Sequence, residues 1–279
     1  MRLYISDLDG TLLNSRQELS PSTIQIINRC LAAGLKFTIA TARSLDSAGP
    51  IITPLNLQLP LILNNGVFVY DPVQKADIVA NLLDERIGCL VLKKCEEHGV
   101  SPLLFTIDRQ NQRRIFYRGI FHHGQEVYIN ERLAKNDRRL TRIEDLSGCL
   151  TPQLQIITIV LIGEADSLAP VHRELREYPG IGCHFTRDIY SGAYWLEIAH
   201  HNATKYWAAQ YLKSYLGADL LICFGDNLND LPLFQAADSC YAVENAHITL
   251  KENATGVIGT NDQNGVAEFI RAAFEEKPA

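Results

Sequence analysis

This sequence of 279 residues lacks both paired cysteines and long apolar runs. Its seven cysteines are odd in number and widely scattered, and none forms the C-x-x-C pair typical of zinc and thiol–disulfide sites. We therefore expect reduced thiols in a reducing compartment, with neither a disulfide framework nor a zinc site. No apolar run approaches the roughly 20 residues that cross a bilayer, and the first residues lack the order of a signal peptide. These absences predict a cytoplasmic location and no membrane partner.

Basic residues are outnumbered by acidic ones. The chain has 26 Lys and Arg against 32 Asp and Glu, a net charge of −6, which argues against nucleic acid as a partner. The exception is the segment 109–142, which holds nine basic and three acidic residues. Such a run is usually a solvated surface, so whether this segment contacts an anionic substrate stays open. Its contrast with the acidic remainder indicates two regions with different roles.

Residues 1–83 alternate between short apolar strands and helices. A helix signal begins at Ser20, a residue type that caps helices, continues with Pro21 in the first turn, and ends at Gly34. Short, almost entirely apolar strands separated by helices are typical of a parallel sheet covered on both faces. The last part of this region alternates around an Asp-Pro turn, which predicts a β-hairpin.

Residues 84–199 differ in character, because several strand-like runs follow one another with three candidate helices among them. That order is typical of an α+β unit. Beyond residue 200 the earlier alternation of strand and helix returns. We therefore predict an α/β core of residues 1–83 and 200–279, with a Rossmann-like parallel sheet, and an inserted α+β domain of residues 84–199.

Polar residues stand directly after the apolar runs of the predicted parallel sheet. Asp7, Thr41 and Asp226 each follow one run, and Asn65 and Gly66 lie in the turn after another. Ligands of open parallel sheets bind beyond the carboxyl ends of the strands. We therefore expect these residues to meet at one edge of the sheet.

Further carboxylates belong to the same edge. Asp9 and Asp230 lie close in sequence to Asp7 and Asp226, and like charges so close together repel unless a cation lies between them. Oxygen ligands without a Cys/His pair favour a hard divalent ion, here Mg²⁺, completed by a phosphate oxygen. Gly10 lets the backbone approach closely and offer an N–H group to an anion. The pattern therefore predicts a magnesium–phosphate site.

Four sequence motifs resemble those of the haloacid dehalogenase (HAD) superfamily. They are "DLDGTLL" (7–13), "TIATAR" (38–43), Lys205 and "GDNLNDLPLF" (225–234). More narrowly, the chain is similar to the Cof-type (subclass IIB) phosphatases, which carry a large cap domain of C2 type between the second and third motifs. The segments "NNG" (64–66) and "ENA" (244–246) also fall where that subfamily has similar ones. The resemblance implies that residues 84–199 are the cap, or substrate-specificity domain.

The resemblance implies a catalytic role for each aspartate of the first motif. Asp7 would be the nucleophile and a magnesium ligand. Asp9 would be the general acid and base, and its backbone carbonyl would also contact the metal. Acid–base exchange needs a second carboxyl within reach of the reacting atoms. We expect Asp9 to meet this need because residues i and i+2 point to the same side of a strand.

The remaining motifs imply the phosphate and metal contacts. Thr41 and Lys205 would hold phosphoryl oxygens during catalysis, Asp226 would bind Mg²⁺, and Asp230 would order the water shell of the metal. The substrate-binding residues implied in this way are Gly10, Thr41, Arg43, Asn65, Gly66, Lys205 and Asn229.

The sequence thus predicts a Mg²⁺-dependent phosphatase that hydrolyses small phosphorylated metabolites through an aspartyl phosphate, with sugar phosphates as the favoured class. A phosphomutase on the same scaffold is one alternative. The other is a non-catalytic protein that binds a phosphorylated metabolite or regulates through the same site. The sequence predicts neither the particular metabolite nor the oligomeric state.

Overall fold

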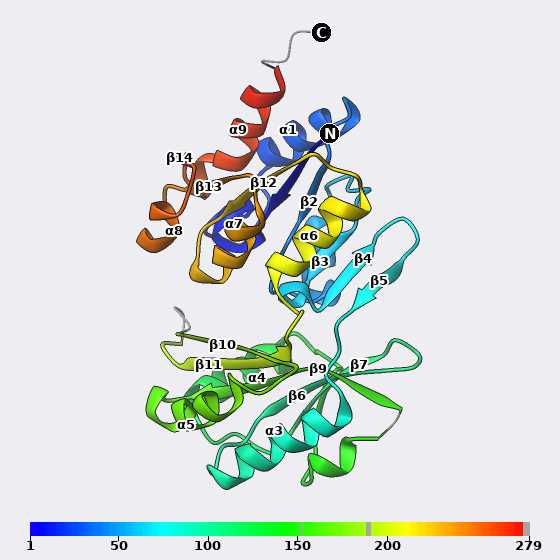
Figure 1. Cartoon of the computed structure of the whole chain (residues 1–279), viewed down its shortest axis with the longest axis vertical. Coiled ribbons are helices and arrows are strands. Elements are labelled where there is room, and N and C mark those ends of the chain that lie inside the picture. Colours follow the sequence, from blue (N-terminus) through cyan, green and yellow to red (C-terminus); the bar gives the residue numbers. More distant parts are fainter. Residues whose placement is uncertain (152, 188–190, 276–279) are drawn as a thin grey trace. The chain divides into compact units, whose positions relative to one another are not determined.

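The computed structural model describes residues 1–151, 153–187 and 191–275. The chain forms two compact units, one of Met1–Ala80 with Asn202–Ala279 and the other of Asn81–His201. We call them the first and the second unit, and Figure 1 shows the strands and helices of each. Their limits lie two or three residues from the domain boundaries expected from the sequence.

A parallel sheet of five strands forms the centre of the first unit, in the order β14-β13-β12-β1-β2. In this sheet β1 lies between β12 and β2, and Ser6 is level with both Phe224 and Ile39. The carboxyl ends of these three strands therefore meet at one edge. The strands are β1 (Arg2–Ser6), β2 (Phe37–Ile39), β12 (Leu220–Gly225), β13 (Ser239–Val243) and β14 (Gly256–Ile258).

Helices cover both faces of this sheet, as its apolar strands predicted. On one face, α6 and α7 pack on Leu3, Ile5 and Leu221. On the other face, Phe269 of α9 packs against the aromatic ring of Phe224, and α9 also contacts α1. The helices are α1 (Pro21–Ala32), α2 (Leu45–Ile52), α6 (Lys205–Tyr215), α7 (Leu231–Ala236), α8 (Ile248–Glu252) and α9 (Gly265–Glu275).

The predicted hairpin is present and extends the sheet. Strands β3 (Leu61–Leu63), β4 (Phe68–Asp71) and β5 (Ala76–Ala80) pair in antiparallel fashion. A parallel bridge between Ala40 and Ile62 joins them to the end of β2. The turn between β3 and β4 is tight, because Asn65 has a φ of 54° and Gly66 a φ of 101°.

The second unit contains a sheet of six strands in the order β10-β11-β9-β6-β7-β8. Its strands pair in antiparallel fashion except for β7 and β8, which are parallel. The α+β class is therefore as expected, although the sequence did not predict the short strand β8. The elements are α3 (Glu85–Glu97), β6 (Leu103–Asp108), β7 (Arg113–Tyr117), α4 (His123–Ala134), β8 (Leu140–Arg142), β9 (Leu154–Gly163), α5 (Ala165–Leu175), β10 (Ile181–Arg187) and β11 (Tyr194–His200).

The two faces of this second sheet have separate apolar clusters. Helices α3 and α5 bury one face, where Leu104, Leu161 and Leu196 form the centre of the larger cluster. Tyr128 and Ile129 of α4 pack on the other face. None of the helices in the described part of the chain combines the length and the apolar character that crossing a membrane requires.

Candidate active site

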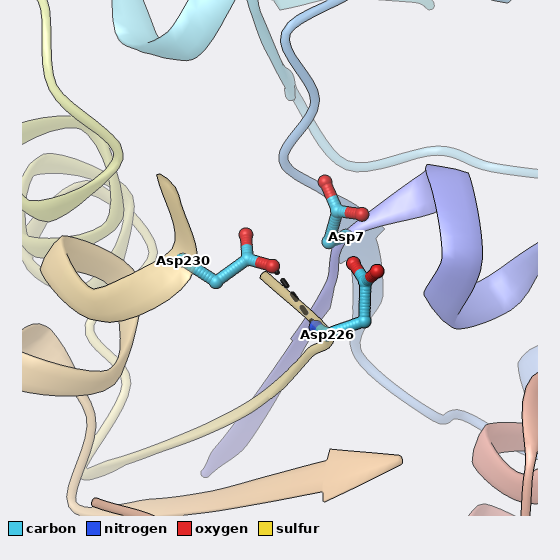
Figure 2. Close-up of side chains that lie close together, drawn as sticks. All are labelled: Asp7, Asp226 and Asp230. Atoms are coloured by element: carbon cyan, nitrogen blue, oxygen red, sulfur yellow. Dashed lines mark hydrogen bonds between the residues drawn. The ribbon is translucent and has the colours of Figure 1, made fainter. Parts of the chain in front are cut away.

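Three carboxylates gather at the carboxyl edge of the parallel sheet (Figure 2). Asp7 follows β1, Asp226 follows β12, and Asp230 lies in the 3₁₀ turn η4 (Leu228–Asp230). One oxygen from each carboxylate lies within 4.8 Å of the others. This group, the acidic cluster, forms because β1 and β12 are neighbouring parallel strands that end at the same level.

Lys205 is buried among these carboxylates. Its Nζ donates to Asp7 Oδ1 and to Asp230 Oδ1, each at 2.6 Å. It is the first residue of α6, and the Oγ1 of Thr204 caps that helix by accepting from the N–H of Trp207. One ammonium therefore pairs with two of the three carboxylates. The site has an excess of negative charge.

Asp230 is held by the backbone as well as by Lys205. Its Oδ2 accepts from the N–H of Asp226 at 3.0 Å and from the N–H of Asn227 at 3.2 Å. Asp230 itself is fully buried. Asp230 therefore fixes the loop that presents Asp226.

The pKa values reflect this crowding. Burial raises the pKa of Asp7 well above its usual range, and the charge of Asp230 adds to the effect, while Lys205 opposes it. Burial and then Asp230 raise the pKa of Asp226 to about 7. Burial lowers the pKa of Lys205, but the charges of Asp230 and Asp7 outweigh it and raise that pKa overall. A divalent cation would relieve this repulsion, and oxygen-only donors suit Mg²⁺.

Glycines allow the acidic cluster to be this compact. Gly10 has a φ of 73°, and a Cβ added there would collide with Asp226 Oδ2. A Cβ at Gly225 would likewise collide with the side chain of Asp230. Thr11 donates from Oγ1 to Asp226 Oδ1 at 3.1 Å. The turn after β1 and the loop after β12 are therefore in direct contact.

Neither Asp7 nor Asp9 lies on a strand, so the strand-based reason for placing both side chains together is wrong. Strand β1 ends at Ser6, and Leu8–Leu12 forms the wide turn η1, whose backbone is not helical at Asp9 and Gly10. Within this turn Gly10 is left-handed, which redirects the chain. The Asp9 carboxylate accepts from Arg43 instead, and its side chain is 40% exposed.

The loops after β2 and β3 are joined by hydrogen bonds. Thr41 is fully buried, its Oγ1 accepts from the N–H of Arg43 at 3.1 Å, and its carbonyl accepts from the N–H of Asn65 at 3.0 Å. Gly66 lies so close to the backbone of Thr204 that a Cβ there would collide with the Thr204 carbonyl. This contact brings the turn 64–66 next to the start of α6.

The predicted site residues make two sets of direct contacts. Asp7, Asp226, Asp230 and Lys205 form one group, and Asp9 with Arg43 forms another. Asn229 is half-buried in η4, next to Asp230.

Three residues that hold the site together were missed by the sequence reasoning. Asn245 donates from Nδ2 to the Gly10 carbonyl at 2.8 Å and accepts from the N–H of Asn261. Asn261 donates in turn to the Leu13 carbonyl. Gln17 contacts Arg43. Asn245 lies within the segment "ENA" already noted, but nothing in the sequence signals the other two.

The parallel α/β sheet with an acidic cluster at its carboxyl edge defines a class of protein that binds its ligand beyond the strand ends. A family model described as haloacid dehalogenase-like hydrolase matches residues 4–270, and the chain belongs to that family. Hydrolases of this superfamily generally use Mg²⁺, and the acidic cluster offers suitable oxygen ligands.

Similar proteins cover nearly the whole chain. The pyridoxal phosphate phosphatase YbhA of Escherichia coli is 25% identical over 280 residues, which cover 96% of this chain and 97% of that protein. The 5-amino-6-(5-phospho-D-ribitylamino)uracil phosphatase YwtE of Bacillus subtilis is 26% identical over 292 residues, 97% of each chain. Among solved structures, the HAD subclass IIB sugar phosphatase BT4131 has a TM-score of 0.72 at 18% identity, covering 98% of this chain and 99% of that one.

These similarities bear directly on the expectations from the sequence. They confirm the resemblance to the HAD superfamily and its Cof-type phosphatases, and they confirm the α/β fold. They also confirm the predicted class of enzyme, a phosphomonoesterase of HAD type.

Proposed function

We propose that this protein is a Mg²⁺-dependent phosphomonoesterase that passes the phosphoryl group of its substrate through Asp7. The observation that carries the proposal is the acidic cluster, in which Asp7 and Asp226 lie within 4.8 Å of each other beside the buried ammonium of Lys205. A carboxylate nucleophile divides a difficult hydrolysis into two easier steps. Preorganised positive charge stabilises the phosphoryl oxygens in both steps.

Asp7 supplies the attacking oxygen. Lys205 Nζ donates a hydrogen bond to Oδ1 of Asp7. The other oxygen, Oδ2, is therefore the one that attacks phosphorus. The new bond joins Asp7 Oδ2 to phosphorus, while the bond from phosphorus to the leaving oxygen breaks. Asp9 gives the leaving oxygen its proton. Water then attacks phosphorus, Asp9 takes a proton from that water, and the bond to Asp7 breaks to release phosphate.

Asp7, Asp226 and the backbone carbonyl of Asp9 would hold the magnesium ion. When bound, Mg²⁺ neutralises charge on the phosphoryl oxygens and on the crowded carboxylates. The contacts of Asp230 suggest that it acts mainly by fixing Lys205 and the Asp226 loop, since both of its oxygens accept hydrogen bonds from them.

The other site residues bind the phosphoryl group and the substrate. Thr41 and Lys205 hold phosphoryl oxygens, and the backbone around Gly10 offers N–H groups to the same anion. Asn65, Gly66 and Asn229 border the site and contact substrate.

The substrate is a small phosphorylated metabolite. The similar proteins are named for pyridoxal phosphate, for a phosphorylated ribitylaminouracil and for sugar phosphates, and we favour sugar phosphates among these classes. The second unit is the proposed cap that selects the leaving group. The basic segment 109–142 within it carries the charge to attract an anionic ester. A cytoplasmic location stays a prediction from composition.

Release of inorganic phosphate from 4-nitrophenyl phosphate tests the proposal. We expect turnover that requires Mg²⁺, stops with a chelator and falls by roughly 10³-fold or more in Asp7→Asn. Asp166→Asn, an exposed position in the first turn of α5, is the matched control and keeps full activity. Acid-quenched enzyme should carry one phosphoryl group on Asp7.

Other outcomes would favour the alternatives. Turnover that depends on a bisphosphorylated activator, with little free phosphate, would identify a phosphomutase. No release from any of a panel of phosphorylated metabolites would identify a binding protein, and it would overturn the proposal. A panel of sugar, pyridoxal and ribityl phosphates also ranks the substrates by kcat/KM.

A further inference from the structure

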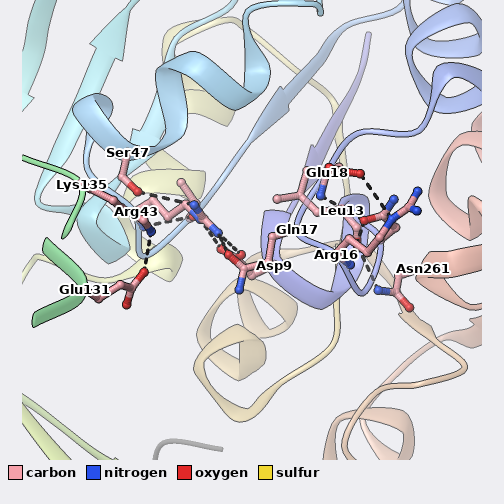
Figure 3. Close-up of polar contacts among 12 residues, drawn as sticks. Asp9, Leu13, Arg16, Gln17, Glu18, Arg43, Ser47, Glu131, Lys135 and Asn261 are labelled. Atoms are coloured by element: carbon pink, nitrogen blue, oxygen red, sulfur yellow. Dashed lines mark hydrogen bonds and ion pairs between the residues drawn. The ribbon is translucent and has the colours of Figure 1, made fainter. Parts of the chain in front are cut away.

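Arg43 donates hydrogen bonds to both oxygens of the Asp9 carboxylate (Figure 3). Its Nε donates to Oδ2 at 2.7 Å and its Nη2 donates to Oδ1 at 2.6 Å. A bidentate ion pair of this kind fixes the plane of the carboxylate as well as its position. The Arg43 side chain is only 19% exposed, so the pair is partly shielded from water.

Gln17 braces this pair from a separate loop. Its Oε1 accepts from Arg43 Nη2 at 2.9 Å. Gln17 has a left-handed φ of 60°, in a turn where its N–H donates to the carbonyl of Asn14 at 2.9 Å. The Asn14 side chain closes the same turn by accepting from the N–H groups of Arg16 and Glu18. Gln17 is itself exposed, so its role is in this contact and not in the apolar core.

These hydrogen bonds orient the guanidinium of Arg43 toward Asp9. Nε and Nη2 serve Asp9 and Gln17, and Nη1 reaches Ser47 Oγ at 3.5 Å. This arrangement differs from the substrate contact that the sequence implied for Arg43.

We propose that Arg43, braced by Gln17, is a positioning residue that holds Asp9 as the base for the second half of the reaction. The inference rests on the proposed function. In that half reaction the oxygen of water bonds to phosphorus, the bond between phosphorus and Asp7 breaks, and a proton of the water passes to the Asp9 carboxylate. Arg43 keeps this carboxylate aimed at the water, and a misplaced base costs up to about 10²-fold in rate.

A kinetic signature separates this role from a substrate contact. Because 4-nitrophenolate is stable as an anion and leaves without a proton from Asp9, Arg43→Met should slow the second half reaction of this substrate and not the first. We therefore expect kcat and KM for 4-nitrophenyl phosphate to fall together by about 10-fold to 100-fold, with kcat/KM nearly unchanged. Rapid mixing should then show a burst of one 4-nitrophenolate per enzyme, and quenched enzyme should accumulate the phosphorylated form.

Further variants distinguish geometry from charge. Arg43→Lys keeps the positive charge but loses the bidentate geometry of the guanidinium. Its kcat should therefore lie between those of Arg43→Met and the wild type. Gln17→Ala should show the same burst with a smaller loss, and its exposed position makes misfolding no obstacle. Arg16→Met lies on the same turn and removes an arginine whose side chain pairs with Glu18. It is the matched control and should behave as the wild type.

The outcomes distinguish this inference from the proposed function. If the wild type shows no turnover, the proposed function itself is contradicted, and no variant needs to be compared. With an active wild type, a raised KM at constant kcat in Arg43→Met would make Arg43 a substrate contact. A fall in kcat/KM without a burst would place its effect in the first half reaction or in folding. Either result overturns the positioning role.

Discussion

The two units bury polar side chains of different kinds. Among the described residues, the ionisable side chains Asp7, Asp71, Lys205 and Asp230 are buried in the first unit, and all but Asp71 lie at the carboxyl edge of its parallel sheet. The buried polar side chains of the second unit are neutral, and they are Ser101, Thr106, Gln125 and Thr158. Burying a charge costs far more than burying a neutral polar group. The unit that bears this cost is therefore the one that carries the chemistry.

The charges of the second unit lie nearer its surface. Arg139 pairs with Asp137, and Lys94 pairs with Glu174, in contacts that leave the side chains partly exposed. Arg132 lies over the ring of Tyr128 at 4.0 Å. Exposed pairs of this kind contribute about 0–1 kcal/mol to the free energy of unfolding. Part of the basic segment 109–142 therefore has local partners within the second unit.

Among the substitutions considered, replacing the buried Lys205 of the first unit should have the largest effect on activity and on stability. In Lys205→Met, two buried carboxylates lose the ammonium that both contact at 2.6 Å. We expect kcat to fall by about 10²-fold to 10³-fold, because the phosphoryl oxygens lose a fixed positive charge. The free energy of unfolding of the metal-free protein should fall by about 3–5 kcal/mol. Steady-state kinetics and denaturant unfolding measure the two effects.

A second lysine of α6 provides the control. Lys213 Nζ pairs with Asp238 at 2.7 Å near the surface, so Lys213→Met should change the free energy of unfolding by at most about 1 kcal/mol. Its kcat should equal that of the wild type. If Lys205→Met retained full activity, the buried ammonium would have no role in phosphoryl transfer.

Substitution of Gly10 separates backbone strain from crowding of the acidic cluster. Gly10 and Gly34 both have positive φ, 73° and 98°, but only a Cβ at Gly10 would collide with Asp226. Both Ala variants should lose about 1–2 kcal/mol in the free energy of unfolding from the left-handed backbone. Gly10→Ala should lose about 1–3 kcal/mol more, because the site is overpacked, and it should bind Mg²⁺ more weakly. Thermal unfolding and Mg²⁺ titration check this, and equal behaviour of the two variants would contradict it.

Gln125 tests the claim that buried polar groups of the second unit are structural. Its Nε2 donates to the Ser101 carbonyl at 2.8 Å, and its Oε1 accepts from the N–H of Phe121 at 2.9 Å. Gln125→Ala leaves both partners without this side chain, so the free energy of unfolding should fall by about 1–3 kcal/mol. Mg²⁺ affinity should not change. A variant with weakened Mg²⁺ binding would show that the contrast between the units is false.

The gathering of Asp7 and Asp226 could be predicted from the sequence because a general rule governs it. Polar residues that follow apolar runs of a parallel sheet meet at one edge, whatever the length of chain between them. Lys205 lacks such a signal, since it begins a helix, and only the family resemblance pointed to it. Its partners Asp7 and Asp230 were not predicted, although both lie among the expected site residues.

Other features depend on geometry that the sequence does not encode locally. The partner of Asp9 is set by the wide turn after β1, where a left-handed Gly10 redirects the chain. The bond from Asn245 to Gly10 spans 235 residues, and no periodic pattern marks it. Strands β8 and β14 have three residues each, none of them buried, whereas the equally short β2 and β3 are buried throughout and lie in apolar runs that the sequence reveals. Tertiary contacts decide such elements.

The smallest expected effect is the pH dependence of Mg²⁺ binding. The pKa of Asp226 is raised from 3.8 to about 7 by burial and by Asp230, so a proton competes with the metal near neutral pH. The pKa of about 7 at Asp226 alone predicts that Mg²⁺ affinity rises about tenfold between pH 6 and pH 8, and the raised pKa of Asp7 acts in the same direction. Titration calorimetry at the two pH values measures this change. An affinity independent of pH would mean that Asp226 is already ionised at pH 6 in the metal-free protein.

Metal-free stability should follow the opposite course with pH. Because the folded-state pKa of Asp226 exceeds its unfolded value of 3.8, folding favours the protonated carboxyl. The stability from this group is complete below about pH 4 and is lost as the pH rises through about 7. The pKa of Asp7 is raised in the same way, so Asp226→Asn should reduce the loss of stability with rising pH without abolishing it.

Thermal unfolding of the metal-free protein measures this dependence. With a chelator present, the Tm should be lower at pH 8 than at pH 5, and excess Mg²⁺ should raise the Tm more at pH 8. A metal-free Tm that did not fall over this range would contradict the buried negative charge that distinguishes the first unit from the second.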